Sequence, residues 1–392
     1  MLLLEPRPEP SRVMRTVTPF IAVILTMAAG AVLFAFLGTN PLDAIRVFFW
    51  DPLFDSTVAS YTRPQLLVKA APLIIIALGL SFGFRAGIWN IGAEGQFIMG
   101  AITGGGFGLA FYPAEGFWVF PMMILAGAFG GFLWAMIPAI LKIRFHANEI
   151  LVSLMLVYVA FNVLAEMVTG PLRNPDGFNW PESRHFQDYP SAHNAELLSG
   201  TGIHFGVIAM FALVVLCFLV LRNHIFGFQV RLAGQSQRAA RFAGIDAALL
   251  TAMCLGLSGA LAGMAGLFEV AGPAGKLSTN FPLGYGFTAI IVAFLGRLHP
   301  VGILLAGLLM ALTYIGGELA QFTLNIPAAA VQVFQGMLLF FLLAVDILVN
   351  FRIRWKRPSG DRSGSEPALA GASAAPSAPL TARARDGKEG QT

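Results

Sequence analysis

Ten separate runs of apolar residues, each close to the length of a membrane-crossing helix, dominate this sequence. A helix needs roughly 20 apolar residues to cross the hydrocarbon core of a bilayer, which is about 30 Å thick. The composition agrees, because 56% of the residues are hydrophobic and only 12% are charged. We therefore predict an all-α polytopic membrane protein with about ten transmembrane helices. The expected spans are residues 18–37, 64–84, 87–112, 116–141, 148–169, 203–221, 247–271, 285–297, 300–320 and 328–350.

The distribution of Lys and Arg predicts the orientation, because cytoplasmic loops retain basic residues. With a cytoplasmic N-terminus, ten spans place 19 of the 25 Lys and Arg on the cytoplasmic side and 6 on the other side. Both termini are therefore expected in the cytoplasm. The net charge of +4 reflects this bias, so we do not expect nucleic-acid binding.

Changes in composition divide the chain into three parts. Residues 1–17 are predicted to be a cytoplasmic N-terminal segment, and residues 18–350 to be the transmembrane domain. Residues 351–392 are predicted to be a disordered cytoplasmic tail, since Pro, Ala, Ser, Gly and Arg predominate there. The two long loops of the domain are 171–202, expected on the extracytoplasmic side of the membrane, and 222–246, expected in the cytoplasm.

A glycine-interrupted stretch at residues 83–108 places Trp89, Asn90, Glu94 and Gln96 between two apolar runs. This pattern is typical of a helix that is broken at membrane depth. Backbone groups cannot stay unpaired against lipid, so such a break must be buried in protein or line a water-filled cavity. We therefore expect these four side chains to line a solute pathway.

Each of these residues also has a purely structural interpretation. Trp89 would suit the aromatic belt at a membrane interface. Asn90 and Gln96 would hydrogen-bond the unwound backbone instead of a solute. Glu94 would form an ion pair, for example with Arg85, because a charge at the bilayer centre needs a partner or water.

The order of the spans suggests two repeats of opposite orientation. Spans two to five begin outside and spans seven to ten begin inside, as in transporters with inverted repeats. Each unit has a glycine-rich interruption after its first long helix, at Gly87–Gly100 and at Gly272–Gly286. Tyr285 and Phe287 border the second interruption, and we expect them to form the wall opposite the first.

The cytoplasmic loop 222–246 is too long for a simple turn, and its centre mixes small residues with arginines. This composition suits a short helix on the membrane face that docks in a groove of a separate motor protein. A solvated basic loop is the alternative. The expected coupling residues are Arg231, Gln235, Arg238, Arg241 and Gly244.

Three separated motifs resemble the permease subunits of bacterial ABC importers. They read GLSFGFRAGIWNIGAEGQFIMGA at Gly79–Ala101, ANEILVSLML at Ala147–Leu156 and RLAGQSQRAARFAGID at Arg231–Asp246. The broad group takes up branched-chain amino acids and simple sugars, and the first motif is most similar to its nucleoside-uptake branch. The resemblance covers about residues 60–350.

This resemblance implies a pathway subunit that has no enzymatic activity. A cytoplasmic ABC ATPase would supply the energy, and a periplasmic or lipid-anchored binding protein would deliver the solute. A second related permease, or a second copy of this chain, would complete the pathway. The sequence has no G-x-x-x-x-G-K-[ST] motif, so ATP is expected to be hydrolysed elsewhere. We expect no cofactor and no metal, and Cys217 and Cys254 fall within apolar spans.

We therefore expect a multi-pass permease of the bacterial inner membrane that moves nucleosides, or a related sugar-bearing solute, inward. The aromatic face of Trp89 favours nucleosides, because bases stack on such faces. The alternatives are a permease for simple sugars or branched-chain amino acids, and a secondary transporter driven by an ion gradient.

Overall fold

The computed structural model describes residues 2–6 and 12–355 of the chain, and helices make up nearly all of this part. Every one of the ten predicted spans is a helix. They are α1 (Arg12–Phe36), α4 (Ala59–Arg85), α5 (Ala93–Ala110), α6 (Val119–Phe145), α7 (Glu149–Thr169), α8 (Phe205–Asn223), α11 (Ala247–Ala271), α12 (Tyr285–Leu295), α13 (Pro300–Leu324) and α14 (Ala328–Asn350). Seven of them are long and apolar enough to cross a membrane, and the other three are α5, α12 and α14. The prediction of an all-α polytopic membrane protein is confirmed.

Short polar caps define where several of these helices begin. Asn148 precedes α7 and accepts hydrogen bonds from the backbone of Ile150 (2.9 Å) and Leu151 (3.4 Å). Asp246 precedes α11 and accepts from Ala248 (2.8 Å) in the same way. Such caps satisfy N–H groups that have no partner within the helix. The polar residues between the apolar runs therefore fix the helix ends.

Several short elements were not predicted from the sequence. They are α2 (Pro41–Phe49), α3 (Asp51–Phe54), the 3₁₀ turn η1 (Phe186–Asp188), β1 (Leu2–Pro6) and β2 (Phe351–Trp355). The two strands pair antiparallel, with Leu2 opposite Trp355. The predicted disordered tail is therefore wrong for residues 351–355, where apolar residues alternate with arginines in the pattern of a strand. The remainder of that tail, residues 356–392, lies outside the described residues.

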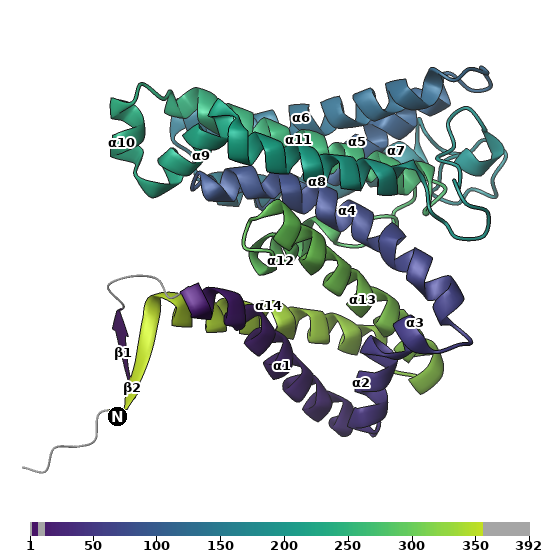
Figure 1. The fold of residues 1–392 in the computed structure, drawn as a ribbon. Coiled ribbons are helices and arrows are strands. Elements are labelled where there is room, and N and C mark those ends of the chain that lie inside the picture. The colour runs from purple at the N-terminus through teal and green to yellow at the C-terminus, as the bar shows by residue number, and fades with distance from the viewer. Residues whose placement is uncertain (1, 7–11, 356–392) are drawn as a thin grey trace, which may run out of the picture.

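Loop 222–246 forms two helices, α9 (Ile225–Gln235) and α10 (Gln237–Phe242). They lie at one end of the bundle, and loop 171–202 lies at the other end (Figure 1). The strand pair β1 and β2 is at the same end as α9 and α10. We call this the α9–α10 end.

Helices α4 and α11 occupy the centre of the bundle and run in opposite directions. Near one end Lys69 acts electrostatically on Glu269, and further along Gly79 lies against the backbone of Ser258. Helix α4 packs on α12 and α13, while α11 packs on α5 and α6. Helix α4 begins the first unit and α11 begins the second. Each of these two helices packs on the second and third helices of the other unit, as expected for an inverted repeat.

Glycines spaced four residues apart let α5, α6 and α11 approach closely. A Cβ atom at Gly263 would overlap the carbonyl oxygen of Gly127, and one at Gly100 would overlap the backbone of Gly263. Small residues at this spacing drive helix association in membranes, because they let backbones touch. The three pairs are Gly100 and Gly104, Gly127 and Gly131, and Gly259 and Gly263.

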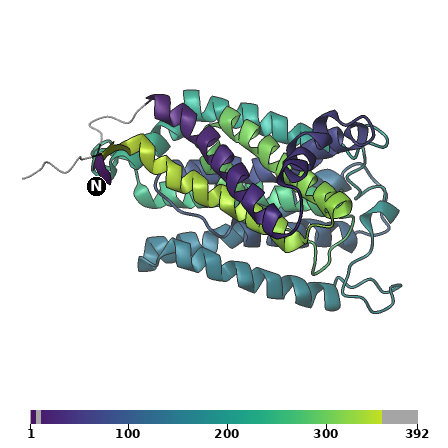
Figure 2. The same ribbon diagram turned by 90° about the horizontal axis from the view of Figure 1, so that it is seen from below.

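Helices α1 and α14 pack on each other along one side of the molecule (Figure 2). At the end away from α9 and α10, Phe34 of α1 lies 5.8 Å from Phe334 of α14 and 5.4 Å from Phe48 of α2, measured between ring centroids. This aromatic cluster explains the position of α2, whose amphipathic sequence buries Phe48 against the two long helices.

The glycine contacts predict opposite effects for two equivalent substitutions. Gly263→Ala should lower the free energy of unfolding by about 1–3 kcal/mol, because the methyl group would force α11 away from α6. Gly336→Ala should raise it slightly, by about 0.5–1 kcal/mol, since alanine is the better helix former. Nothing lies within 4 Å of a Cβ atom at this exposed position in α14. Thermal unfolding of the detergent-solubilised protein measures both changes, and equal effects would contradict close packing at Gly263.

Candidate functional site

The predicted helix break is present between α4 and α5, and this part of the fold is confirmed. Helix α4 ends at Arg85, and regular helix resumes at Ala93. The backbone between them is paired despite the break. Ile88 donates to the carbonyl oxygen of Gly83 (2.9 Å), and Ile91 donates to the hydroxyl of Ser153 on α7 (3.2 Å). The break thus meets the requirement that backbone at membrane depth find partners within the protein.

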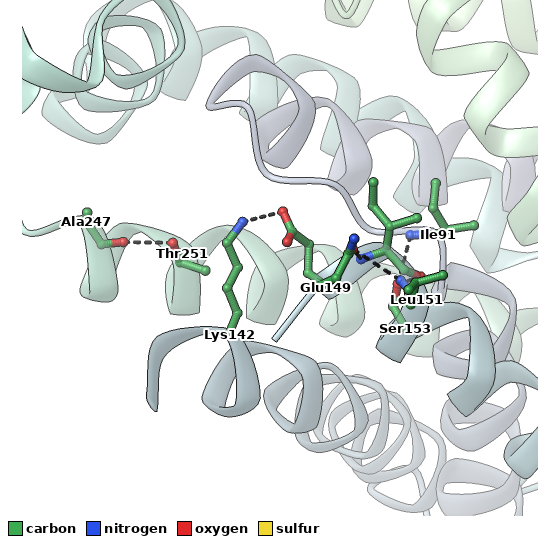
Figure 3. A network of polar contacts seen from close by, with 9 residues as sticks. Ile91, Lys142, Glu149, Leu151, Ser153, Ala247 and Thr251 are labelled. Atoms are coloured by element: carbon green, nitrogen blue, oxygen red, sulfur yellow. Dashed lines mark hydrogen bonds and ion pairs between the residues drawn. The ribbon is translucent and has the colours of Figure 1, made fainter. Parts of the chain in front are cut away.

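Figure 3 shows how α7 supports this segment. The backbone N–H of Ile91 faces the Ser153 hydroxyl, and Glu149 at the start of α7 pairs with Lys142 of α6. Two neighbouring helices are therefore fixed to each other directly beside the break.

Asn90 and Gln96 bind each other within the protein interior. The Asn90 amide nitrogen donates to the Gln96 carbonyl oxygen (2.8 Å), and the Gln96 amide nitrogen donates back (3.2 Å). Asn90 also donates to Ser258 (3.0 Å) near the middle of α11 and accepts from the backbone of Gly92 (3.0 Å). Both side chains are buried, so in this conformation they support the unwound backbone. Their predicted contact with solute stays a prediction.

Glu94 connects the break before α5 with the glycine-rich segment before α12. Its side chain is fully buried, and its carboxylate accepts hydrogen bonds from the backbone of Gly284 (3.0 Å) and Gly286 (2.5 Å) at the start of α12. The positive end of the α12 dipole adds to this stabilisation. The alternative of an ion pair with Arg85 is wrong, because the Arg85 guanidinium donates to the carbonyl oxygen of Leu298 (2.9 Å).

Aromatic side chains at the two breaks are partly exposed. Trp89 is 39% exposed and stacks on Phe294 of α12, with ring centroids 5.7 Å apart. Phe287 is also 39% exposed and precedes Phe294 by two helical turns, so both lie on one face of α12. Tyr285 is fully buried and packs edge-on against Phe97. Of the six predicted pocket residues, only Trp89 and Phe287 are exposed in this conformation.

A second polar group lies between α4, α11, α12 and α13, and it was not predicted as a group from the sequence. Glu269 of α11 is buried and interacts electrostatically with Lys69, which forms an ion pair with Glu318 (3.3 Å). Within the described part of the chain, the buried hydroxyl of Tyr285 has no hydrogen-bond partner. The nearby ring of Tyr314 lies 5.8 Å away. These residues are far apart in the sequence, so only the fold brings them together.

The predicted coupling residues all lie on the surface of the α9–α10 end. Arg231 and Gln235 are on α9, Arg238 and Arg241 are on α10, and Gly244 follows α10. Phe242, the last residue of α10, was not predicted as a contact and is 94% exposed.

Helix α9 contacts the break directly. A Cβ atom at Gly234 would overlap the carbonyl oxygen of Arg85, the last residue of α4. A cavity of about 160 Å³ lies beside this contact and is lined by Gly87 of the break and by Ala240 of α10, among others. A movement of α9 and α10 would therefore press on the end of α4 and on the break.

The structure is a bundle of apolar helices, and its two breaks meet at the buried carboxylate of Glu94. These are features of multi-pass membrane transport subunits. The chain belongs to the branched-chain amino acid transport system permease component family, whose model matches residues 63–343. Its predicted membership of the ABC permeases is therefore confirmed.

Curated relatives cover nearly all of the chain. It is 33% identical over 363 residues to the glucose ABC transporter permease protein of Haloferax volcanii, which is 90% of this chain and 93% of that protein. It is 28% identical over 348 residues to the guanosine ABC transporter permease protein of Bacillus subtilis, 84% and 94% of the two chains. It is 26% identical over 357 residues to the nucleoside ABC transporter permease protein of Lactococcus lactis, 86% and 92%.

The contacts of Glu94 predict a graded loss of stability. Glu94→Ala should lower the free energy of unfolding by about 2–3 kcal/mol, because two buried N–H groups lose a charged acceptor. Glu94→Gln should cost less, since an amide oxygen can still accept. Glu166 is exposed on α7, so Glu166→Ala is the matched control and should have almost no effect. Denaturant unfolding in detergent measures the series, and equal stability of the Ala variant and the wild type would contradict the structural role.

Proposed function

We propose that this protein is the membrane-spanning subunit of an ATP-driven importer that moves nucleosides, or a related sugar-bearing solute, across the bacterial inner membrane. The observation that carries the proposal is the pair of exposed aromatic side chains at the two breaks, Trp89 before α5 and Phe287 in the first turn of α12. The guanosine and nucleoside permeases among the relatives support the same solute class.

A simple sugar is the second candidate solute. The Haloferax volcanii relative, at 33% identity, is named as a glucose permease. Membership of the ABC permease family counts against the alternative of an ion-driven secondary transporter.

We assign different roles to the six predicted pocket residues. Trp89 and Phe287 would contact the solute, because they are already exposed. The buried residues would hold the wall in place and reach the solute only when the bundle opens. They are Asn90, Glu94, Gln96 and Tyr285.

The arrangement of the two ends supports an orientation with both termini in the cytoplasm. Helices α9 and α10, with most of the loop arginines, lie at the same end as β1 and β2 (Figure 1). A separate cytoplasmic ABC ATPase would dock there, and a periplasmic or lipid-anchored binding protein would dock on loop 171–202. A second permease, either related or a further copy of this chain, would complete the pathway.

In the proposed coupling, the ATPase moves α10, and α9 passes this motion to the break. Arg231, Gln235, Arg238, Arg241 and Gly244 would form the docking surface, with Phe242 as its apolar anchor. The contact between Gly234 and Arg85 would transmit the displacement, because its two backbones cannot approach further.

Uptake by the assembled transporter tests the solute class. Radiolabelled guanosine should be taken up and should be outcompeted by other nucleosides but not by glucose or leucine. Trp89→Ala should reduce guanosine uptake about 5- to 100-fold, because base stacking contributes roughly 1–3 kcal/mol. Trp50→Ala, at a 57% exposed position outside loop 171–202, is the matched control. Competition by glucose alone would favour the second candidate, and unchanged uptake in Trp89→Ala would remove Trp89 from the pathway.

Co-purification of the ATPase tests the docking surface. Phe242→Ala should weaken retention of the ATPase at least tenfold, since exposed aromatic anchors often contribute 2 kcal/mol or more to an interface. Phe117, at the opposite end of the bundle, is also 94% exposed, so Phe117→Ala should retain the ATPase fully. Equal retention by the two variants would show that α10 is not the docking element.

A further inference from the structure

A pocket of about 470 Å³ lies at the end of the bundle opposite α9 and α10, between loop 171–202 and the segment that leads into α12 (Figure 1). We call it the outer pocket. Its volume falls within the range of about 300–1,000 Å³ that is usual for small-molecule sites. All its lining side chains except one proline are aromatic or polar. The lining residues are Trp180, Pro181 and Glu182 of the loop, and Lys276, Ser278, Thr279 and Asn280 of the segment.

Backbone hydrogen bonds join the two sides of the outer pocket. Ser183 donates its backbone N–H to the carbonyl oxygen of Leu277 (2.9 Å), and the N–H of Leu277 donates to the Ser183 hydroxyl (3.0 Å). Glu182 and Lys276 form an ion pair at 2.5 Å beside these bonds. The loop and the segment are therefore fixed to each other, and the pocket is largely preformed, as ligand sites usually are.

The inner wall of the outer pocket belongs to the segment that forms the second break. Phe281, directly after the lining residues, stacks on Phe97 of α5, with ring centroids 5.2 Å apart. Three residues later Gly284 donates to the Glu94 carboxylate (3.0 Å), and Phe287 is exposed in the first turn of α12. One short segment thus connects the outer pocket with the proposed solute contact at Phe287.

The side chains of the outer pocket match a sugar that is joined to a flat ring. Trp180 is 67% exposed, so its indole face is open for stacking. An ionised carboxylate has about four acceptor sites, and Lys276 occupies only one of those of Glu182. Lys276 itself has three N–H donors, so both groups can still bond hydroxyls. Groups that both donate and accept are added by Ser278, Thr279 and Asn280.

The ion pair in the outer pocket favours an uncharged ligand. Glu182 and Lys276 neutralise each other, so the pair attracts neither a phosphate nor a cation by net charge. A charged ligand would have to separate the two groups, whereas a hydroxyl can bond to them while they stay paired. The lining therefore suits a nucleoside better than a nucleotide.

We propose that the outer pocket is a receiving site of the pathway and binds a nucleoside, with its base on Trp180 and its ribose hydroxyls on Glu182 and Lys276. This inference rests on the proposed function, because a binding protein docked on loop 171–202 would release the solute beside the site. All nucleosides share a flat base and ribose hydroxyls. The site would therefore accept the class without selecting one member.

Photo-cross-linking of the assembled transporter tests this site. The permease and its ATPase, in nanodiscs without the binding protein, are illuminated with 8-azidoguanosine, and peptide mass spectrometry locates the adducts. Adducts should form on residues 180–182 or 276–280, and excess guanosine should prevent them. The analogue 2′,3′-dideoxyguanosine should compete about fivefold less well, because it lacks the ribose hydroxyls and a hydrogen bond contributes about 1 kcal/mol. Equal competition by the two nucleosides would overturn the ribose contacts.

Guanosine uptake by the same preparation, with the binding protein added, separates this inference from the proposed function. If guanosine is taken up but adducts form only elsewhere on the chain, the outer pocket is not a receiving site and the proposed function stands. If guanosine is neither taken up nor able to prevent the adducts, both proposals fail.

Two exposed aromatic residues of the same loop form a matched pair of variants. Trp180→Ala should reduce the adducts about 5- to 100-fold, the loss expected when base stacking is removed. Phe178 is 95% exposed and does not line the pocket, so Phe178→Ala should leave the adducts unchanged. Equal labelling of the two variants would overturn the site.

Retention of the binding protein separates solute binding from docking. Trp180→Ala should retain the binding protein as well as the wild type does, because the proposed role of Trp180 is to contact the solute. Loss of the binding protein from this variant, with the adducts unchanged, would make Trp180 a docking contact and overturn the assignment.

Discussion

The carboxylate of Glu94 links the two halves of this membrane protein. Helices α5 and α12 both begin inside the bundle, where water is not available to bond their first N–H groups, and an unpaired group there is costly. One side chain on α5 accepts from Gly284 and Gly286 of α12, so the second break is stabilised by the first. The same contact fixes α12 against α5 and thereby determines where Phe287 and Phe294 face. The exposed aromatic face thus depends on a buried carboxyl group on the neighbouring helix.

Glycine packing brings the backbones of several helices into direct contact. Helices α5, α6 and α11 touch through their backbones at Gly100, Gly127 and Gly263, and no side chain can adjust there. Helix α12 has only 11 residues and is held by Glu94 at one end and by a strained turn at Arg297 at the other. A Cβ atom at Gly286 would overlap the backbone of Glu94, so the first turn of α12 is also packed closely on α5.

The sequence was sufficient to predict the ten helices, because apolar length and helix caps are local properties. It also placed a break within residues 87–100, since glycines and polar residues interrupt an apolar run, whereas in the structure regular helix resumes at Ala93. It could not identify the partners of Glu94, which lie 190 and 192 residues away and are backbone groups without a side-chain signature. The short helix α2 and strand β2 were missed for a related reason: each is stabilised by a distant segment, α2 by the ring of Phe334 and β2 by the N-terminal strand.

The proposed pathway wall also limits how this subunit can discriminate between solutes. The amide groups of Asn90 and Gln96 are committed to each other and to Ser258, so the exposed wall at the break is mainly aromatic. In this conformation the exposed wall separates solutes by shape and stacking, which discriminates far less than paired polar groups do. A purine has a larger flat face than a hexose, and this favours nucleosides on Trp89. On this view fine selectivity resides with the protein that delivers the solute, and the permease provides a route of suitable width.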